Sequence, residues 1–191
     1  MNNVQVQMLN VSIMKNPIIE EILKITPSLR IPNWYLGAGC IAQTVWNQAH
    51  GFDPSFGIKD YDIVYFDASD LSYEAEDRMV KSVKNALKHL NASIDVVNEA
   101  RVHMWYRDHF GFNIEPYNSA EDAISNWPTT ATSIGVRCGE SGNFVVRAPF
   151  GLEDLFELVV RPNKKQITKD IYLQKVERWI KMWPKLNVIL W

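Results

Sequence analysis

Two aspartates, Asp60 and Asp62, stand one residue apart in the segment GIKDYDIVYFD, residues 57–67. Aspartate is a poor strand former, yet the apolar residues that follow are typical of a strand. Because side chains alternate along a strand, both carboxylates would leave one face and Tyr61 the other. Crowded carboxylates repel each other, and Mg²⁺, which accepts one or two protein carboxylates with phosphate oxygens and water, relieves that repulsion. The pair predicts a metal site, although Asp60 could also simply end the preceding loop.

Two further segments carry residue types that suit the same chemistry. In LGAG, residues 36–39, Gly37 and Gly39 predict a turn between a strand and a helix, where backbone N–H groups can approach a phosphate. A tight turn with no ligand explains the glycines as well. In SIDVV, Asp95 interrupts a short apolar strand. It is either a solvated residue at a sheet edge or a third carboxylate beside the first two.

Helical and strand patterns interleave along the chain. The spacing of apolar residues and the capping residues predict helices over residues 4–14, 17–25, 40–51, 72–90, 102–111, 119–127, 152–160 and 167–183. Strands are expected over residues 34–36, 61–66 and 92–98, and a hairpin over 132–138 and 143–149 with its turn in GESG, residues 139–142. These elements predict an α/β or α+β fold with a small mixed sheet flanked by helices, and with helical N- and C-terminal parts.

Composition narrows the class of protein. The 191 residues have a formal net charge of −2, which argues against a basic nucleic-acid coat, and 12% of them are aromatic, which argues against disorder. Cys40 and Cys138 have no metal-ligand spacing and form no disulfide framework. The first residues lack the pattern of a signal peptide, and no apolar run approaches the ~20 residues needed to cross a bilayer. We therefore expect a cytoplasmic protein with free thiols and no membrane partner.

Taken together, the segments resemble a known superfamily. A Gly-x-Gly turn at a helix start, a strand with Asp-x-Asp and a later strand with a third Asp are similar to the nucleotidyltransferase (polymerase β-like) superfamily. Within it, GAGCIAQTVWNQ, IKDYDIVYFD and GLEDLFELVVRPN resemble signature segments of a bacterial family of nucleotidyltransferase-like proteins. The resemblance covers roughly residues 17–185. It implies a single domain over residues 1–191, with a core at about 17–160 and a basic helical part at about 161–191.

The resemblance also implies roles for individual residues. Asp60 and Asp62 would hold Mg²⁺ against a nucleoside triphosphate, and Asp95 would complete the site of a second Mg²⁺ or act as the base toward the acceptor hydroxyl. The turn of Gly37, Ala38 and Gly39 would contact phosphate. Ala38 departs from the superfamily pattern, which often has Gly or Ser there.

The C-terminal part adds basic and aromatic candidates. Residues 161–191 hold eight Lys and Arg against two acidic residues, a pattern typical of a solvated helix face or of a phosphate-binding surface. Within this part, Arg161 and Lys164 follow a helix end and are the expected phosphate contacts. Trp105 and Tyr106, close behind the SIDVV strand, are the aromatic residues most suited to stack on a base.

Three hypotheses follow from these residues. The first is a Mg²⁺-dependent nucleotidyltransferase that transfers a nucleoside monophosphate to an acceptor, which is a small molecule, an RNA end or a protein hydroxyl. The second is a catalytically inactive module of the same fold that binds nucleotide or a partner. The third is a structural protein whose acidic residues are merely exposed. The sequence does not indicate the acceptor, the base preference or the oligomeric state.

Overall fold

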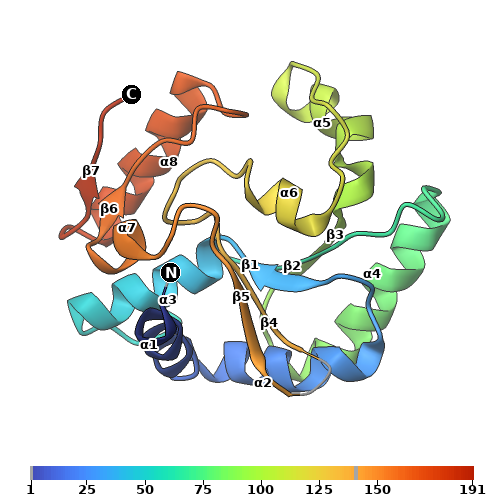
Figure 1. Ribbon diagram of the computed structural model, residues 1–191, viewed down its shortest axis with the longest axis horizontal. Coiled ribbons are helices and arrows are strands. Elements are labelled where there is room, and N and C mark those ends of the chain that lie inside the picture. The colour runs from blue at the N-terminus through green and yellow to red at the C-terminus, as the bar shows by residue number, and fades with distance from the viewer. Residues whose placement is uncertain (1, 140–141) are drawn as a thin grey trace.

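A mixed five-stranded sheet surrounded by helices forms the centre of the chain (Figure 1). The computed structural model describes residues 2–139 and 142–191, and the strand order is β3-β2-β1-β4-β5. The strands are β1 Tyr35–Gly37, β2 Tyr61–Tyr65, β3 Ile94–Asn98, β4 Gly135–Cys138, β5 Phe144–Arg147, β6 Val159–Val160 and β7 Asn187–Val188. The helices are α1 Asn3–Ile13, α2 Pro17–Ile25, α3 Gly39–His50, α4 Tyr73–Leu87, α5 Val102–Phe110, α6 Ala120–Ile124, α7 Glu153–Phe156 and α8 Lys169–Met182, with 3₁₀ turns η1 Thr26–Leu29, η2 Lys88–Leu90 and η3 Glu99–Arg101. The predicted fold class is confirmed.

Strand β2, which contains Asp62, lies between β1 and β3 in the sheet. It pairs antiparallel with β1 on one side and parallel with β3 on the other. Parallel neighbours need a crossover, and α4 supplies it between β2 and β3. Ser72 begins α4 by accepting a hydrogen bond from the backbone N–H of Ala75, as predicted.

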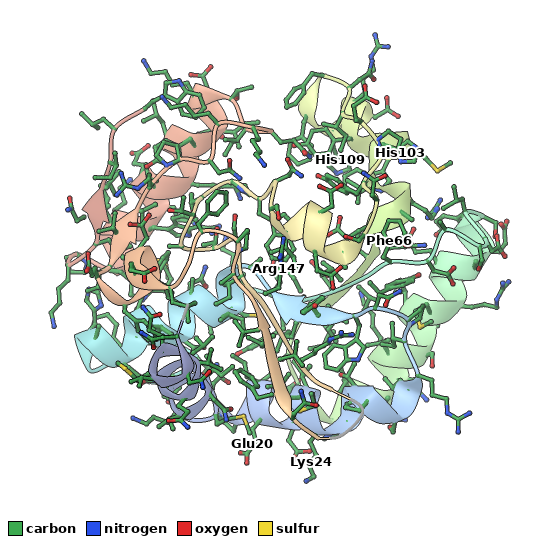
Figure 2. The ribbon with its side chains drawn as sticks, in the orientation of Figure 1. Glu20, Lys24, Phe66, His103, His109 and Arg147 are labelled. Atoms are coloured by element: carbon green, nitrogen blue, oxygen red, sulfur yellow. The ribbon has the colours of Figure 1, made fainter. Side chains whose placement is uncertain are left out.

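The two faces of the sheet differ in what covers them. Tyr61, Ile63 and Tyr65 of β2 point into the main core, together with buried residues of α1 to α4. On the opposite face, Val64 belongs to a smaller cluster with α6, and Phe66 packs against this cluster and against a second one that includes α5 (Figure 2). The smaller clusters leave part of that face open to a cavity.

The C-terminal helix α8 is fixed to α3 by tryptophans. The fully buried ring of Trp46 contacts Trp179 and Trp183 edge-on, with ring centroids 5.4 and 5.5 Å away. The indole N–H of Trp183 donates to Oδ1 of the buried Asn47 at 2.6 Å. These contacts place α8 beside the N-terminal half of the chain, as the neighbouring ribbons in Figure 1 also show.

One predicted element was wrong in part. The helix expected over residues 152–160 ends after the four residues of α7, and Val159–Val160 form β6, which pairs parallel with β7. Leu158 has φ of 59°, a left-handed conformation that ends a helix, and β-branched valines favour a strand. The predicted hairpin strands pair antiparallel as β4 and β5, but residues 140–141 of its expected turn lie outside the described residues.

No helix within residues 2–139 and 142–191 is both long enough and apolar enough to cross a membrane.

Candidate active site

Asp60 and Asp62 line a cavity of about 420 Å³ on the sheet face opposite the main core. Asp60 directly precedes β2 and Asp62 lies within it, so strand alternation sends both side chains to this face. Tyr61, between them, is 3% exposed and packs in the main core. The structure therefore brings the two carboxylates together at the cavity wall.

Asp95 leaves the same face of the sheet but does not line the cavity. It is the Cα partner of Asp62 across the parallel pair, and parallel partners project to the same side. Its side chain is exposed on β3, the edge strand. Within residues 2–139 and 142–191, no group of three or more Asp, Glu, His or Cys side chains is arranged to hold one ion. Asp60 and Asp62 are therefore the two carboxylates at the cavity wall, and Asp95 lies beside them outside the cavity.

The pKa of Asp62 reflects first its burial and then the acidic side chains beside it. Burial raises the pKa of Asp62 to about 7, and the charges of Asp60 and Asp95 add to the rise. The ammonium of Lys175 opposes it. The acidic side chains around Asp62 thus disfavour its charged form, whereas Lys175 favours it.

The turn before α3 forms the next part of the wall. A Cβ on Gly37 would lie 2.6 Å from the carbonyl oxygen of Ile134, so only glycine fits there. Ala38 has φ of 59° and ψ of −130°, a strained conformation for a non-glycine residue. Ala38 and Gly39 line the cavity, and no side chain caps the first N–H groups of α3.

Three cationic side chains line the cavity: Lys59, Lys175 and Arg178. The last two lie one turn apart on α8. The pKa of Lys175 is lowered by burial and by the neighbouring Arg178, while the charges of Asp62 and Asp60 oppose that shift.

The two basic residues predicted to contact phosphate lie elsewhere. Arg161 forms an ion pair with Asp154 at 3.1 Å, and the ammonium of Lys164 sits 5.0 Å from the ring centroid of Trp191. Neither is among the residues that line the cavity. The basic segment does reach the site, through residues of α8 instead.

Part of the cavity wall is aromatic, and we call this part the aromatic chamber. It is defined by Glu99, Trp105, Tyr106, Phe110, Tyr117 and Trp127, from η3, α5 and the segments beside α6. The hydroxyl of Tyr106 donates to the carbonyl oxygen of Gln166 at 3.0 Å, and the Gln166 side-chain amide donates to the hydroxyl of Tyr117. The segment that precedes α8 thereby joins the two tyrosines.

Comparison with known proteins places this geometry in a family. A family model described as "Nucleotidyltransferase" matches residues 24–188. The chain belongs to this nucleotidyltransferase family. A solved NMR structure described as a CCA-adding enzyme head domain is similar in fold, with a TM-score of 0.77 and 24% identity over 97% of this chain and 96% of the other. A search of curated proteins found no significant match.

The donor set of this nucleotidyltransferase fits a hard divalent cation. Asp60 and Asp62 supply carboxylate oxygens, the ligands that Mg²⁺ prefers, and the charge of Asp60 adds to the rise in the pKa of Asp62 that burial causes. Mg²⁺ needs only one or two protein carboxylates when phosphate oxygens and water complete its shell. The pair is therefore sufficient as the protein's share of one such site.

Glu99 was missed by the sequence reasoning. It is 4% exposed, and burial raises its pKa to about 8, with the charge of Asp62 adding to the rise and a hydrogen bond from Trp127 opposing it. Strand alternation gave no signal for it, because β3 ends at Asn98 and Glu99 begins the 3₁₀ turn η3. The two aromatic residues predicted to stack on a base, Trp105 and Tyr106, both line the cavity.

Proposed function

We propose that this chain is a Mg²⁺-dependent nucleotidyltransferase that transfers a nucleoside monophosphate from a nucleoside triphosphate to a hydroxyl group. The observation that carries the proposal is the Asp60/Asp62 pair on the wall of a cavity that also holds a helix N-terminus and three cations. Carboxylates with no cation nearby would only repel a triphosphate. The combination of opposite charges on one wall suits a metal–triphosphate complex.

The triphosphate has a complementary surface in this cavity. The N–H groups of the first turn of α3 and the positive end of its dipole favour an anion beside Gly39. Lys59, Lys175 and Arg178 add charge from the other walls. We assign phosphate binding to these groups and to Ala38, in place of Arg161 and Lys164.

The reaction needs one bond to form and one to break. The acceptor hydroxyl oxygen forms a bond to the α-phosphorus, and the bond from that phosphorus to the bridging oxygen breaks, so that pyrophosphate leaves with the electron pair. We assign the hydroxyl proton to Asp95, which projects beside Asp62 and is open to solvent. Mg²⁺ held by Asp60 and Asp62 would neutralise charge on the reacting phosphate.

The free thiols of Cys40 and Cys138 agree with a reducing compartment such as the cytoplasm.

Calorimetric titration with each nucleoside triphosphate, with and without Mg²⁺, tests the proposal. We expect Mg²⁺-dependent binding that Asp60→Asn and Asp62→Asn each weaken by about tenfold or more, because a charged ligand contact is lost. Asp108→Asn, at an exposed position of α5, is the matched control and should bind as the unaltered protein does. A nucleotide affinity that changes neither with Mg²⁺ nor with either substitution would refute the proposed site.

A second function, a binding module without transfer activity, is favoured by one observation. Asp95 stays outside the cavity, so the base assigned above is not enclosed with the acceptor. Pyrophosphate release measured over pools of small alcohols, RNA and proteins separates the two functions. Mg²⁺-dependent nucleotide binding without pyrophosphate release from any pool would support the module.

A further inference from the structure

Glu99 is a buried acid with no cation beside it. Among residues 2–139 and 142–191, no Lys, Arg or His forms an ion pair with it, and its neighbours are Trp127, Tyr117 and the acidic Asp62. Burying a carboxyl group in this way is costly unless a partner balances it. Because Glu99 lines the cavity, a ligand can reach it and be that partner.

The walls around Glu99 suit a cation. Trp105, Tyr106, Tyr117 and Trp127 present aromatic rings to the same cavity. The faces of such rings attract ammonium groups, most strongly when water is excluded. A carboxylate at the end of an aromatic enclosure therefore favours an amine over an uncharged group of the same shape.

The sheet order places the aromatic chamber on the acceptor's side of the acidic pair. Strand β2 lies between β1, which leads into the Gly39 turn, and β3, which leads into Glu99 and α5. In-line displacement requires the attacking oxygen to approach opposite the leaving pyrophosphate. With the phosphates at the start of α3, the acceptor approaches from the β3 side, where Glu99 and the α5 residues of the aromatic chamber lie.

We propose that the aromatic chamber binds the acceptor and that this acceptor is a small amino alcohol, whose ammonium lies against Glu99 while its hydroxyl reaches the Asp60/Asp62 pair. The inference rests on the proposed function for the transfer step, but the amine site can be measured without it. Glu99 begins η3, directly after β3, whereas Asp62 lies within β2, so the two acids stand at different places on the cavity wall. The amine and the hydroxyl of the acceptor are therefore separated by several bonds.

The test compares two probes of similar length, 6-aminohexan-1-ol and hexane-1,6-diol. Each is titrated into the full chain and followed by NMR, with and without Mg²⁺ and ATP. We expect the amino alcohol to bind at least about tenfold more tightly than the diol, because a charge-assisted contact separates them. Glu99→Gln keeps the volume and removes the charge, so it should bring the ratio below about threefold.

Two more variants control the result. Glu115→Gln changes an exposed acid outside the cavity and should keep the full ratio. Trp105→Leu removes one aromatic wall and should weaken amine binding even if Glu99→Gln fails to fold. Equal binding of the two probes, no binding of the amino alcohol below about 10 mM, or an unchanged ratio in Glu99→Gln would overturn the proposal.

Nucleotide binding separates this proposal from the one on which it rests. If the unaltered protein prefers the amine but binds no ATP, the transferase function fails and the amine site stands. If Glu99→Gln weakens ATP binding as much as amine binding, the aromatic chamber holds the nucleobase. That outcome would overturn the assignment of the acceptor.

Discussion

Replacing Asp62 with Asn should stabilise the metal-free protein at neutral and alkaline pH. The pKa of Asp62 is about 7 in the folded chain, whereas an unperturbed Asp titrates near pH ~3.9. The folded state thus keeps a proton that the unfolded state loses, and the free energy of unfolding falls as the pH rises from ~4 to ~7. Three pKa units at ~1.4 kcal/mol each set an upper limit of about 4 kcal/mol above pH 7, and we expect about 2–4 kcal/mol.

Urea unfolding at pH 4, 6 and 8 measures this difference directly. The free energy of unfolding of Asp62→Asn should equal that of the unaltered protein at pH 4 and exceed it increasingly toward pH 8. Asp108→Asn, on the exposed side of α5, should show no such divergence. Mg²⁺ should stabilise the unaltered protein and not the variant, because the pair is then incomplete. Destabilisation of Asp62→Asn at pH 8, or parallel pH profiles, would refute the account in which burial and neighbouring charges raise the pKa of Asp62.

Three further predictions concern the cations, the turn and the docking of α8. Lys175→Met should weaken binding of the magnesium–triphosphate complex by about tenfold in a calorimetric titration, whereas Arg161→Met, which alters a residue outside the cavity, should leave it unchanged. Gly37→Ala should lower the free energy of urea unfolding by about 2–4 kcal/mol, because its Cβ would clash with backbone. Asn47→Ala should cost about 1–3 kcal/mol, seen as a lower melting temperature, since it leaves the buried indole N–H of Trp183 without its acceptor.

Features that depend on neighbouring residues in the chain were predictable. The alternation of Asp60, Tyr61 and Asp62 follows from the two-residue period of a strand, and the structure has this arrangement. The glycine turn and the helix after it were predictable for the same reason, since both depend on backbone preferences within a few residues.

The choice among the basic residues was not predictable. Arg161, Lys164, Lys175 and Arg178 all belong to one basic segment, and nothing local separates them. The packing of α8 on Trp46 sets the rotation of the helix, and this rotation turns the last two residues of that set into the cavity. Such a contact joins residues more than a hundred positions apart, so no local pattern contains it.

By itself, the sequence determined the family resemblance, the faces of β2 and the types of group available to a metal and a phosphate. Only the tertiary structure decided which carboxylates share an enclosed space: Asp60, Asp62 and Glu99 line the cavity, while Asp95 remains exposed. The reason is physical, because the direction of a side chain follows from backbone geometry at its own strand, whereas its burial depends on the helices that pack above it.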